Sequence, residues 1–359
     1  MKQNNQAIPF NKENFKQIFS VSFVLVILIS IPGAIIADFF NIPLAWFLGP
    51  MLVTSLASLM GLKIEMPRLI LSSILILLGL YIGNYIDKSL FAQMHQWIWT
   101  SLIMLIYIIL SVLIVSKYLQ KFSKYEQKTS IFSAAPGALG PLMILAEDEK
   151  TDLSQVATSH LIRLIIIITV FPFIVNSFYD FEGVESAQKI IDNQNISHLL
   201  ILIITSVILI YFFDRLKLPA ALLSGTLVAS GLLQITDIAA YEISADIIDF
   251  CLLILGASVG CRFADKTFGE IGRNALHSFV ATFLLVLLGL IAAFTASLII
   301  DKNFFTLLLS YCPGGIYEVA VIAIFFDLDP EFVSFHHIIR LLMILFIVPI
   351  ILKLISKKT

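Results

Sequence analysis

Two copies of a histidine followed three residues later by an arginine lie inside strongly apolar sequence. The first is His160 with Arg163 in "HLIRL", and the second is His337 with Arg340 in "HIIRL". Residues three apart share one face of a helix. A charged side chain at the bilayer centre costs about 2.5–3.5 kcal/mol on insertion scales, so it usually faces a substrate pathway or pairs with backbone carbonyls. For the arginines we therefore consider two roles: binding a substrate or ion, or acting as a clip that hydrogen-bonds the unpaired backbone carbonyls of the adjacent broken segment. For the histidines the two roles are a proton relay and a structural contact between helices.

A helix breaker precedes each pair, in "SAAPGALGP" at 133–141 and "SYCPGGIYE" at 310–318. Proline lacks a backbone donor and glycine loosens the backbone, which favours broken helices at Pro136-Gly137 and at Pro313-Gly314-Gly315. Such breaks survive at membrane depth only where protein or water covers the freed groups, and half-helix N-termini there suit an anion. Glu318 follows the second break only, as a proton or cation site or as a helix cap.

The composition predicts that lipid surrounds most of the chain. Of 359 residues, 59% are hydrophobic and 13% are charged, against about 25% charged in soluble domains. The net charge of −2 and the absence of a dense basic cluster give no reason to expect a nucleic-acid partner. No spacing of cysteine or histidine predicts a metal, and no motif predicts a cofactor or an enzymatic nucleophile.

Twelve apolar segments follow one another and divide into two similar halves. At a shift of 177 residues the first breaker, the His–Arg pair and Pro172 match the second breaker, its pair and Pro349. We expect a first membrane repeat at 1–180, an acidic connector at 181–196 and a second repeat at 197–359. The predicted segments are 17–37 (an uncleaved first helix), 43–61, 69–86, 97–116, 129–147, 157–178, 197–213, 218–235, 248–264, 276–300, 304–326 and 335–356.

Lysine and arginine placement favours two repeats of opposite orientation. If segments 129–147 and 304–326 enter and leave on one side, 18 of these residues face the cytoplasm and 3 face outside. The fold class is then an all-α polytopic membrane protein with two inverted repeats, each with about five spanning helices and one broken or re-entrant segment. Both termini are cytoplasmic in this topology. The alternative is a broken helix that still crosses, with another segment, such as "FLGPM" at 47–51, failing to span.

The duplicated arrangement resembles the membrane AbrB family. The resemblance rests on "APGALGPLMILAEDEKTDLSQVATSHLIRLIIIITVFP" at 135–172 and "CPGGIYEVAVIAIFFDLDPEFVSFHHIIRLLMILFIVP" at 312–349. It implies an inner-membrane protein with a role in regulating gene expression, although family members are also labelled ammonia monooxygenases. The family's Gly-Gly-x-x-Glu pattern stands here as Gly314-Gly315-Ile316-Tyr317-Glu318, and the first copy departs from it with Ala138 and Pro141.

These patterns lead us to expect a secondary transporter of a small, anionic organic solute that works by alternating access. The alternative is a membrane regulator of gene expression that acts indirectly and without transport. An ammonia-oxidising enzyme is the weakest hypothesis, because no residue pattern holds a redox metal. The expected partners are the lipid bilayer and an unnamed solute, and a homo-oligomer is compatible with them. The residues expected to bind solute or ion are Pro136, Gly137, His160, Arg163, Pro313, Gly314, Gly315, Glu318, His337 and Arg340.

Overall fold

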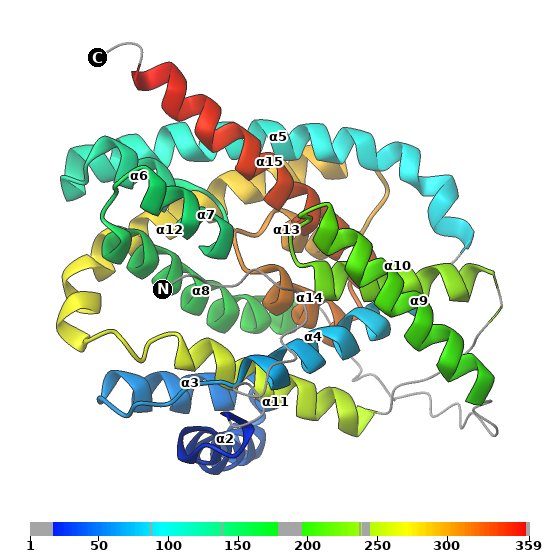
Figure 1. Cartoon of the computed structure of the whole chain (residues 1–359). Helices are drawn as coiled ribbons and strands as arrows, with labels where there is room; N and C mark the ends of the chain where they lie inside the picture. Colours follow the sequence, from blue (N-terminus) through cyan, green and yellow to red (C-terminus); the bar gives the residue numbers. More distant parts are fainter. Residues whose placement is uncertain are drawn as a thin grey trace. The chain divides into compact units, whose positions relative to one another are not determined.

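The computed structural model describes residues 17–86, 88–137, 139–178, 196–236, 238 and 245–356 (Figure 1). The acidic connector predicted at 181–196 lies outside this part of the chain, apart from residue 196. Most of the described residues are helical, and none of them lies in a strand. The helices are α2 (Val21–Phe39), α3 (Ala45–Leu59), α4 (Arg68–Gly83), α5 (Lys88–Ser123), α6 (Gln127–Ala134), α7 (Leu139–Asp148), α8 (Leu153–Phe178), α9 (Ile196–Arg215), α10 (Ala221–Ile235), α11 (Ala245–Cys261), α12 (Phe268–Ser297), α13 (Phe304–Tyr311), α14 (Ile316–Phe325) and α15 (Pro330–Ser356).

Six of the described helices are long and apolar enough to cross a membrane: α2, α5, α8, α9, α12 and α15. The chain is therefore a multi-pass membrane protein. Four other predicted spans form helices of 15 to 17 residues, namely α3, α4, α10 and α11, which is short of the roughly 20 residues that cross a hydrocarbon core. About five spanning helices in each half were expected, and the described residues contain six helices in all that are long and apolar enough to span.

The helices form two compact units, and each unit takes helices from both halves of the sequence. The first unit contains α2, α3, α4, α9, α10 and α11. The second contains α6, α7, α8, α12, α13, α14, α15 and all but the first residues of α5. Every predicted site residue belongs to the second unit. The units thus group the helices differently from the two sequence repeats.

In the first unit, α3 packs against α11 and α4 packs against α10, with a glycine at each crossing. A Cβ added to Gly79 would lie 2.5 Å from the backbone oxygen of Leu223. A Cβ added to Gly256 would lie 2.2 Å from the backbone oxygen of Phe47. Both distances are too short for any side chain, so each glycine is required by close helix packing. The two glycines are 177 residues apart and therefore occupy matching places in the repeat.

Hydroxyl groups at these two helix crossings also occupy matching positions in the two halves of the sequence. Ser230 on α10 donates a hydrogen bond to the carbonyl of Leu80 on α4 at 2.9 Å. Thr54 on α3 approaches the carbonyl of Ala257 on α11 at 3.3 Å. Interhelical hydrogen bonds of this kind hold membrane helices together where apolar burial gives little driving force.

The backbone before α3 and before α10 has the same unusual shape. Leu44 and Ala220, the residues that precede these helices, have φ angles of 55° and 54°. Asn41 and Lys217, three residues earlier, have φ angles of 51° and 55°. Residues other than glycine seldom adopt positive φ, so the shared conformation at matching positions indicates that the repeat extends to local structure.

The second unit is built around the long helices α8, α12 and α15. Helix α12 packs against α8 and α13, while α6 and α7 pack against α8, and α13 and α14 pack against α15. Pro172 and Pro349 lie inside α8 and α15 without ending them, as is tolerated in membrane helices whose freed groups find other partners. The breaks at Pro136 and Pro313 do end helices, at Ala134 and Tyr311.

Candidate functional site

Each broken segment is a helical hairpin whose two ends meet. At the start of α6, Lys128 Nζ lies 2.6 Å from Oε2 of Glu149, which follows α7. Just before α13, Lys302 Nζ lies 2.8 Å from Oδ1 of Asp329, which follows α14. A helix that crossed the bilayer would place its two ends about 30 Å apart, so these contacts show that neither segment is a broken but crossing helix.

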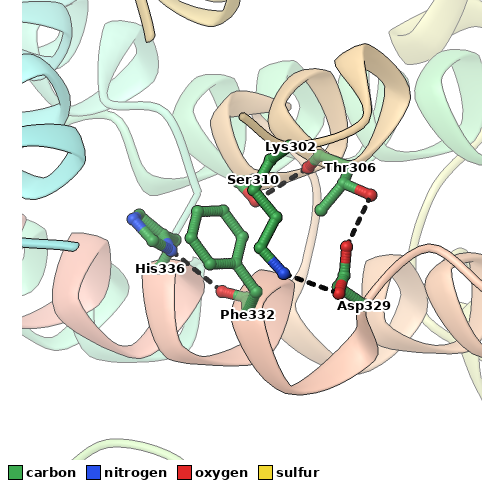
Figure 2. A network of polar contacts seen from close by, with 6 residues as sticks. All are labelled: Lys302, Thr306, Ser310, Asp329, Phe332 and His336. Carbon is green, nitrogen blue, oxygen red and sulfur yellow. Dashed lines mark hydrogen bonds and ion pairs between the residues drawn. The ribbon is translucent and has the colours of Figure 1, made fainter. Parts of the chain in front are cut away.

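The second hairpin base is a small polar network (Figure 2). The Asp329 carboxylate also accepts a hydrogen bond from Thr306 Oγ1 at 3.3 Å, and the Lys302 ammonium lies 5.6 Å from the centre of the Phe332 ring. The base of the first hairpin is simpler, with Thr129 Oγ1 accepting from the backbone N–H of Asp152 at 3.2 Å.

The hairpin tips and the arginines lie at matching depths. The hairpin arms have 8 or 10 residues, which is about 12–15 Å of helix. Arg163 and Arg340 each come ten residues after the first residue of α8 and α15, which is also about 15 Å. Both arginine residues are buried, at 3% and 0% exposure, so neither side chain reaches the protein surface.

The second His–Arg pair binds its own hairpin at the tip. His337 Nε2 lies 3.0 Å from the carbonyl oxygen of Leu309, in the last turns of α13. Arg340 donates Nη1–H to the carbonyl of Cys312 and Nη2–H to the carbonyl of Gly314 at 2.6 Å. These two carbonyls lie in the break, where no helix supplies them with a donor. Arg340 therefore makes the carbonyl clip that the sequence offered as one alternative.

The first pair repeats part of this arrangement. His160 Nε2 lies 2.9 Å from the carbonyl oxygen of Phe132 on α6, and Arg163 Nη2 lies 2.5 Å from Nδ1 of His160. In the second pair the corresponding guanidinium-to-imidazole distance, between Arg340 Nη2 and His337 Nδ1, is 3.1 Å.

These contacts fix the state of both histidines. A carbonyl oxygen only accepts, so each Nε2 carries the hydrogen. The guanidinium only donates, so each Nδ1 offers its lone pair to the arginine. His160 and His337 are thus neutral rings that orient Arg163 and Arg340, an arrangement that favours the helix-contact interpretation of the histidines.

The two tips converge at Arg340. Gly137, in the first break, has a φ angle of 104°, and a Cβ added there would lie 2.7 Å from Nη2 of Arg340. A Cβ added to Gly314, in the second break, would lie 3.5 Å from the Ile167 side chain on α8. Each tip therefore reaches the long helix of the other half, and Arg340 touches both breaks.

Glu318 lies beside the second break in the first turn of α14, with 1% exposure. Gly315 is the N-cap of this helix, and a Cβ added to Gly315 would lie 1.9 Å from Oε2 of Glu318. A glutamate at this position, folded back over the N-cap, is stabilised by the positive end of the helix. The geometry matches the capping alternative, and the first hairpin has no equivalent because Pro141 occupies that position.

Neither buried arginine forms an ion pair with a carboxylate among the residues that the structure describes. A buried charge without a counter-charge is costly, and here two such charges lie in one unit of the fold. The same described residues contain no cluster of histidine, cysteine, aspartate or glutamate suited to a metal ion.

Sequence reasoning missed a cluster on α5 beside the hairpins. Thr100 Oγ1 lies 2.7 Å from Nε2 of the buried His336, and the Thr100 carbonyl accepts from Tyr311 Oη at 2.8 Å. Tyr107, about two turns further along α5, packs edge-on against Tyr311 with ring centres 6.2 Å apart. No spacing in the apolar run of α5 distinguishes Thr100 or Tyr107 from residues that face lipid.

A groove of about 580 Å³ also lies between α5 and α15, but it is a separate feature. Its lining includes Trp97, Leu102, Phe335, Ile339 and Met343, and none of the predicted site residues. The groove is largely apolar and does not explain the buried arginines.

The fold and the site define a multi-pass helical membrane protein with two helical hairpins, each bound by a buried histidine and arginine. Residues 46–356 match the family model described as "Transition state regulatory protein AbrB". This match covers most of the chain, and the protein belongs to the AbrB family.

Two curated relatives are similar over nearly their whole length. "Uncharacterized protein YhjN" of Bacillus subtilis (strain 168) is 24% identical over 352 residues, covering 90% of each chain. "Putative regulator AbrB" of Escherichia coli (strain K12) is 23% identical over 317 residues, covering 88% of this chain and 91% of the relative. No solved structure matches the chain.

Proposed function

We propose that this protein is a secondary transporter of a small, anionic organic solute. The observation that carries the proposal is the pair of buried guanidiniums, Arg163 and Arg340, which no carboxylate of the described residues neutralises. Charged groups inside membrane segments usually mark a substrate or ion pathway. An anion between the hairpin tips would supply the missing negative charge.

The proposed mechanism is alternating access between two inverted repeats in the bacterial cytoplasmic membrane, with both termini in the cytoplasm. It is supported by the reciprocal packing of α3 on α11 and of α4 on α10, and by hairpins whose ends meet on one side. Discontinuous helices at the interface of inverted repeats are the usual place for a transported solute. Because the histidines hold the arginines as neutral rings, we assign proton coupling to Glu318 before His160 or His337.

Uptake into proteoliposomes tests the proposal. The purified chain is reconstituted and offered labelled organic anions, with neutral and cationic compounds of similar size as controls. We expect uptake of at least one anion and its loss in Arg163→Ala and Arg340→Ala, each checked for monodispersity. Arg163→Ala is the cleaner variant, because the Cys312 and Gly314 carbonyls keep their Arg340 donors. Uptake that both variants retain would remove the arginines from the pathway.

The second candidate is a regulator of gene expression that acts without transport, favoured by the name of the Escherichia coli relative. A deletion strain separates the two candidates. An expression phenotype that transport-dead Arg163→Ala still complements would favour regulation independent of flux. A phenotype that requires Arg163 would favour transport as its cause.

A further inference from the structure

The groove between α5 and α15 follows these two helices into the membrane. The apolar span of α5 begins at His95, and that of α15 begins at Pro330. On α5 the groove lining runs from His95 to Leu102, and on α15 it runs from Phe335 to Met343. The groove therefore starts near one edge of both apolar spans and leads toward their middle.

The length and polarity of the groove match one lipid chain. Phe335 and Met343 are eight residues apart, which is about 12 Å of helix. Half of a hydrocarbon core, the depth of one leaflet, is about 15 Å. The walls along this length are largely apolar and include Ile98, Leu102 and Ile339. An acyl chain of one leaflet therefore fits along the groove.

The end of the groove at the membrane edge carries hydrogen-bonding side chains, namely His95, Trp97 and Ser101. Trp97 is 7% exposed, and its buried Nε1–H forms no hydrogen bond with any residue that the structure describes. The N–H of a buried tryptophan usually has an acceptor. The Trp97 ring packs against Phe332 and Phe335, with ring centres 5.2 and 4.9 Å apart, so the indole is held at this edge. A ligand with an acceptor above an apolar chain suits both ends of the groove.

We propose that the groove binds one phospholipid. Its acyl chain lies along Leu102, Ile339 and Met343, and an ester carbonyl accepts a hydrogen bond from the Trp97 N–H. Lipid tails are as apolar as these side chains, so apolar burial alone does not keep a lipid at one place. Contact with two helices at once adds dispersion attraction, and the hydrogen bond fixes the depth of the ester group.

Such a lipid should stay bound when detergent removes the lipids from open faces of the helices. Native mass spectrometry of the purified full-length chain, with palmitoyl-oleoyl phosphatidylethanolamine added after washing, measures this retention. We expect one retained phospholipid in the wild type and its loss in Ser101→Trp and Ile339→Trp, which fill the groove from α5 and from α15. The matched controls are Ile106→Trp and Phe346→Trp on the same two helices, at positions 58% and 70% exposed and outside the lining. Both controls should keep the lipid.

A second comparison tests the hydrogen bond without filling the groove. A diether phospholipid with the same chains and headgroup lacks the ester carbonyls. We expect the wild type to bind the diester about three- to tenfold more tightly, the factor for one hydrogen bond. Trp97→Phe keeps an aromatic ring but removes the N–H, and it should bind the two lipids equally. Trp99→Phe is the control, because Trp99 is 56% exposed and does not line the groove, and it should keep the preference.

Each outcome decides one part of the proposal. If the wild type retains no phospholipid, or if the groove-filling variants retain as much as their controls, the lipid site is overturned. If the wild type binds diester and diether equally, or Trp97→Phe keeps the preference, the Trp97 hydrogen bond is overturned and the chain-binding groove survives. A retained detergent or fatty acid in place of a phospholipid overturns the assignment of the ligand. The groove contains none of the residues of the proposed solute site, so failure here leaves anion uptake to its own test.

Discussion

Each buried arginine is positioned by the histidine one helical turn before it. That histidine is hydrogen-bonded to a backbone carbonyl of the first short helix of the hairpin, α6 or α13. This arrangement transmits the position of the hairpin to the guanidinium, because His337 holds the Leu309 carbonyl and Arg340 holds the carbonyls of Cys312 and Gly314. The type and spacing of these residues were predictable from the sequence. Their partners were not, because a backbone carbonyl carries no sequence signal.

The glycine at the crossing of α3 and α11 gives a prediction at the same scale. Gly256→Ala would place a methyl group against the backbone of Phe47, which cannot move aside as a side chain can. We expect overpacking to destabilise the protein by about 1–3 kcal/mol, measured as a lower thermal midpoint in detergent. Gly272→Ala is the control, since nothing lies within 4 Å of its Cβ position. Equal midpoints for the two variants would contradict the packing of α3 on α11.

At the scale of elements, the two hairpins are alike in outline but differ at their bases. The side chains of Lys302 and Asp329 are 13% and 31% exposed, whereas those of Lys128 and Glu149 are 50% and 42% exposed. The proline and glycine breakers predicted where these helices end. The breakers did not show whether each segment is a hairpin or a crossing helix. That difference shows in the ion pairs between the two ends of each segment, whose members lie 21 and 27 residues apart in the sequence.

The difference in exposure predicts unequal effects of removing the two lysines. Lys302→Ala leaves Asp329 in a partly buried place without its cation, and we expect a loss of about 1–2 kcal/mol in the free energy of unfolding. Lys128→Ala removes a solvent-exposed pair, which is worth less than about 1 kcal/mol. Chemical unfolding of both variants in the same detergent measures the difference. A loss that is equal, or larger for Lys128→Ala, would show that the two bases are not anchored differently.

At the scale of the whole molecule, two compact units each draw on both sequence repeats. The repeat itself was visible in the matched breakers and pairs. The grouping of helices into units was not, because apolar helix faces for lipid and for protein have similar composition, and the short helices α3, α4, α10 and α11 read in the sequence as ordinary spans.

The proposed inverted orientation of the repeats predicts which loops face each side of the membrane. In a variant without its three native cysteines, Lys302→Cys should react with an impermeant maleimide added to intact cells. Arg262→Cys should react only after the membrane is opened. The expectation follows from the cytoplasmic excess of lysine and arginine. Reaction of Arg262→Cys in intact cells would overturn the inverted topology.

The reach of Thr54 across 203 residues to the carbonyl of Ala257 has a consequence for biosynthesis. At a translation rate of about 5–20 residues per second, α3 waits about 10–40 seconds for α11 to leave the ribosome. During that interval the 15-residue helix α3 can already pack on α2, but the side of α3 that α11 will cover faces only lipid or the insertion machinery. A nascent chain halted after its first repeat would still lack the helix on which α3 closes.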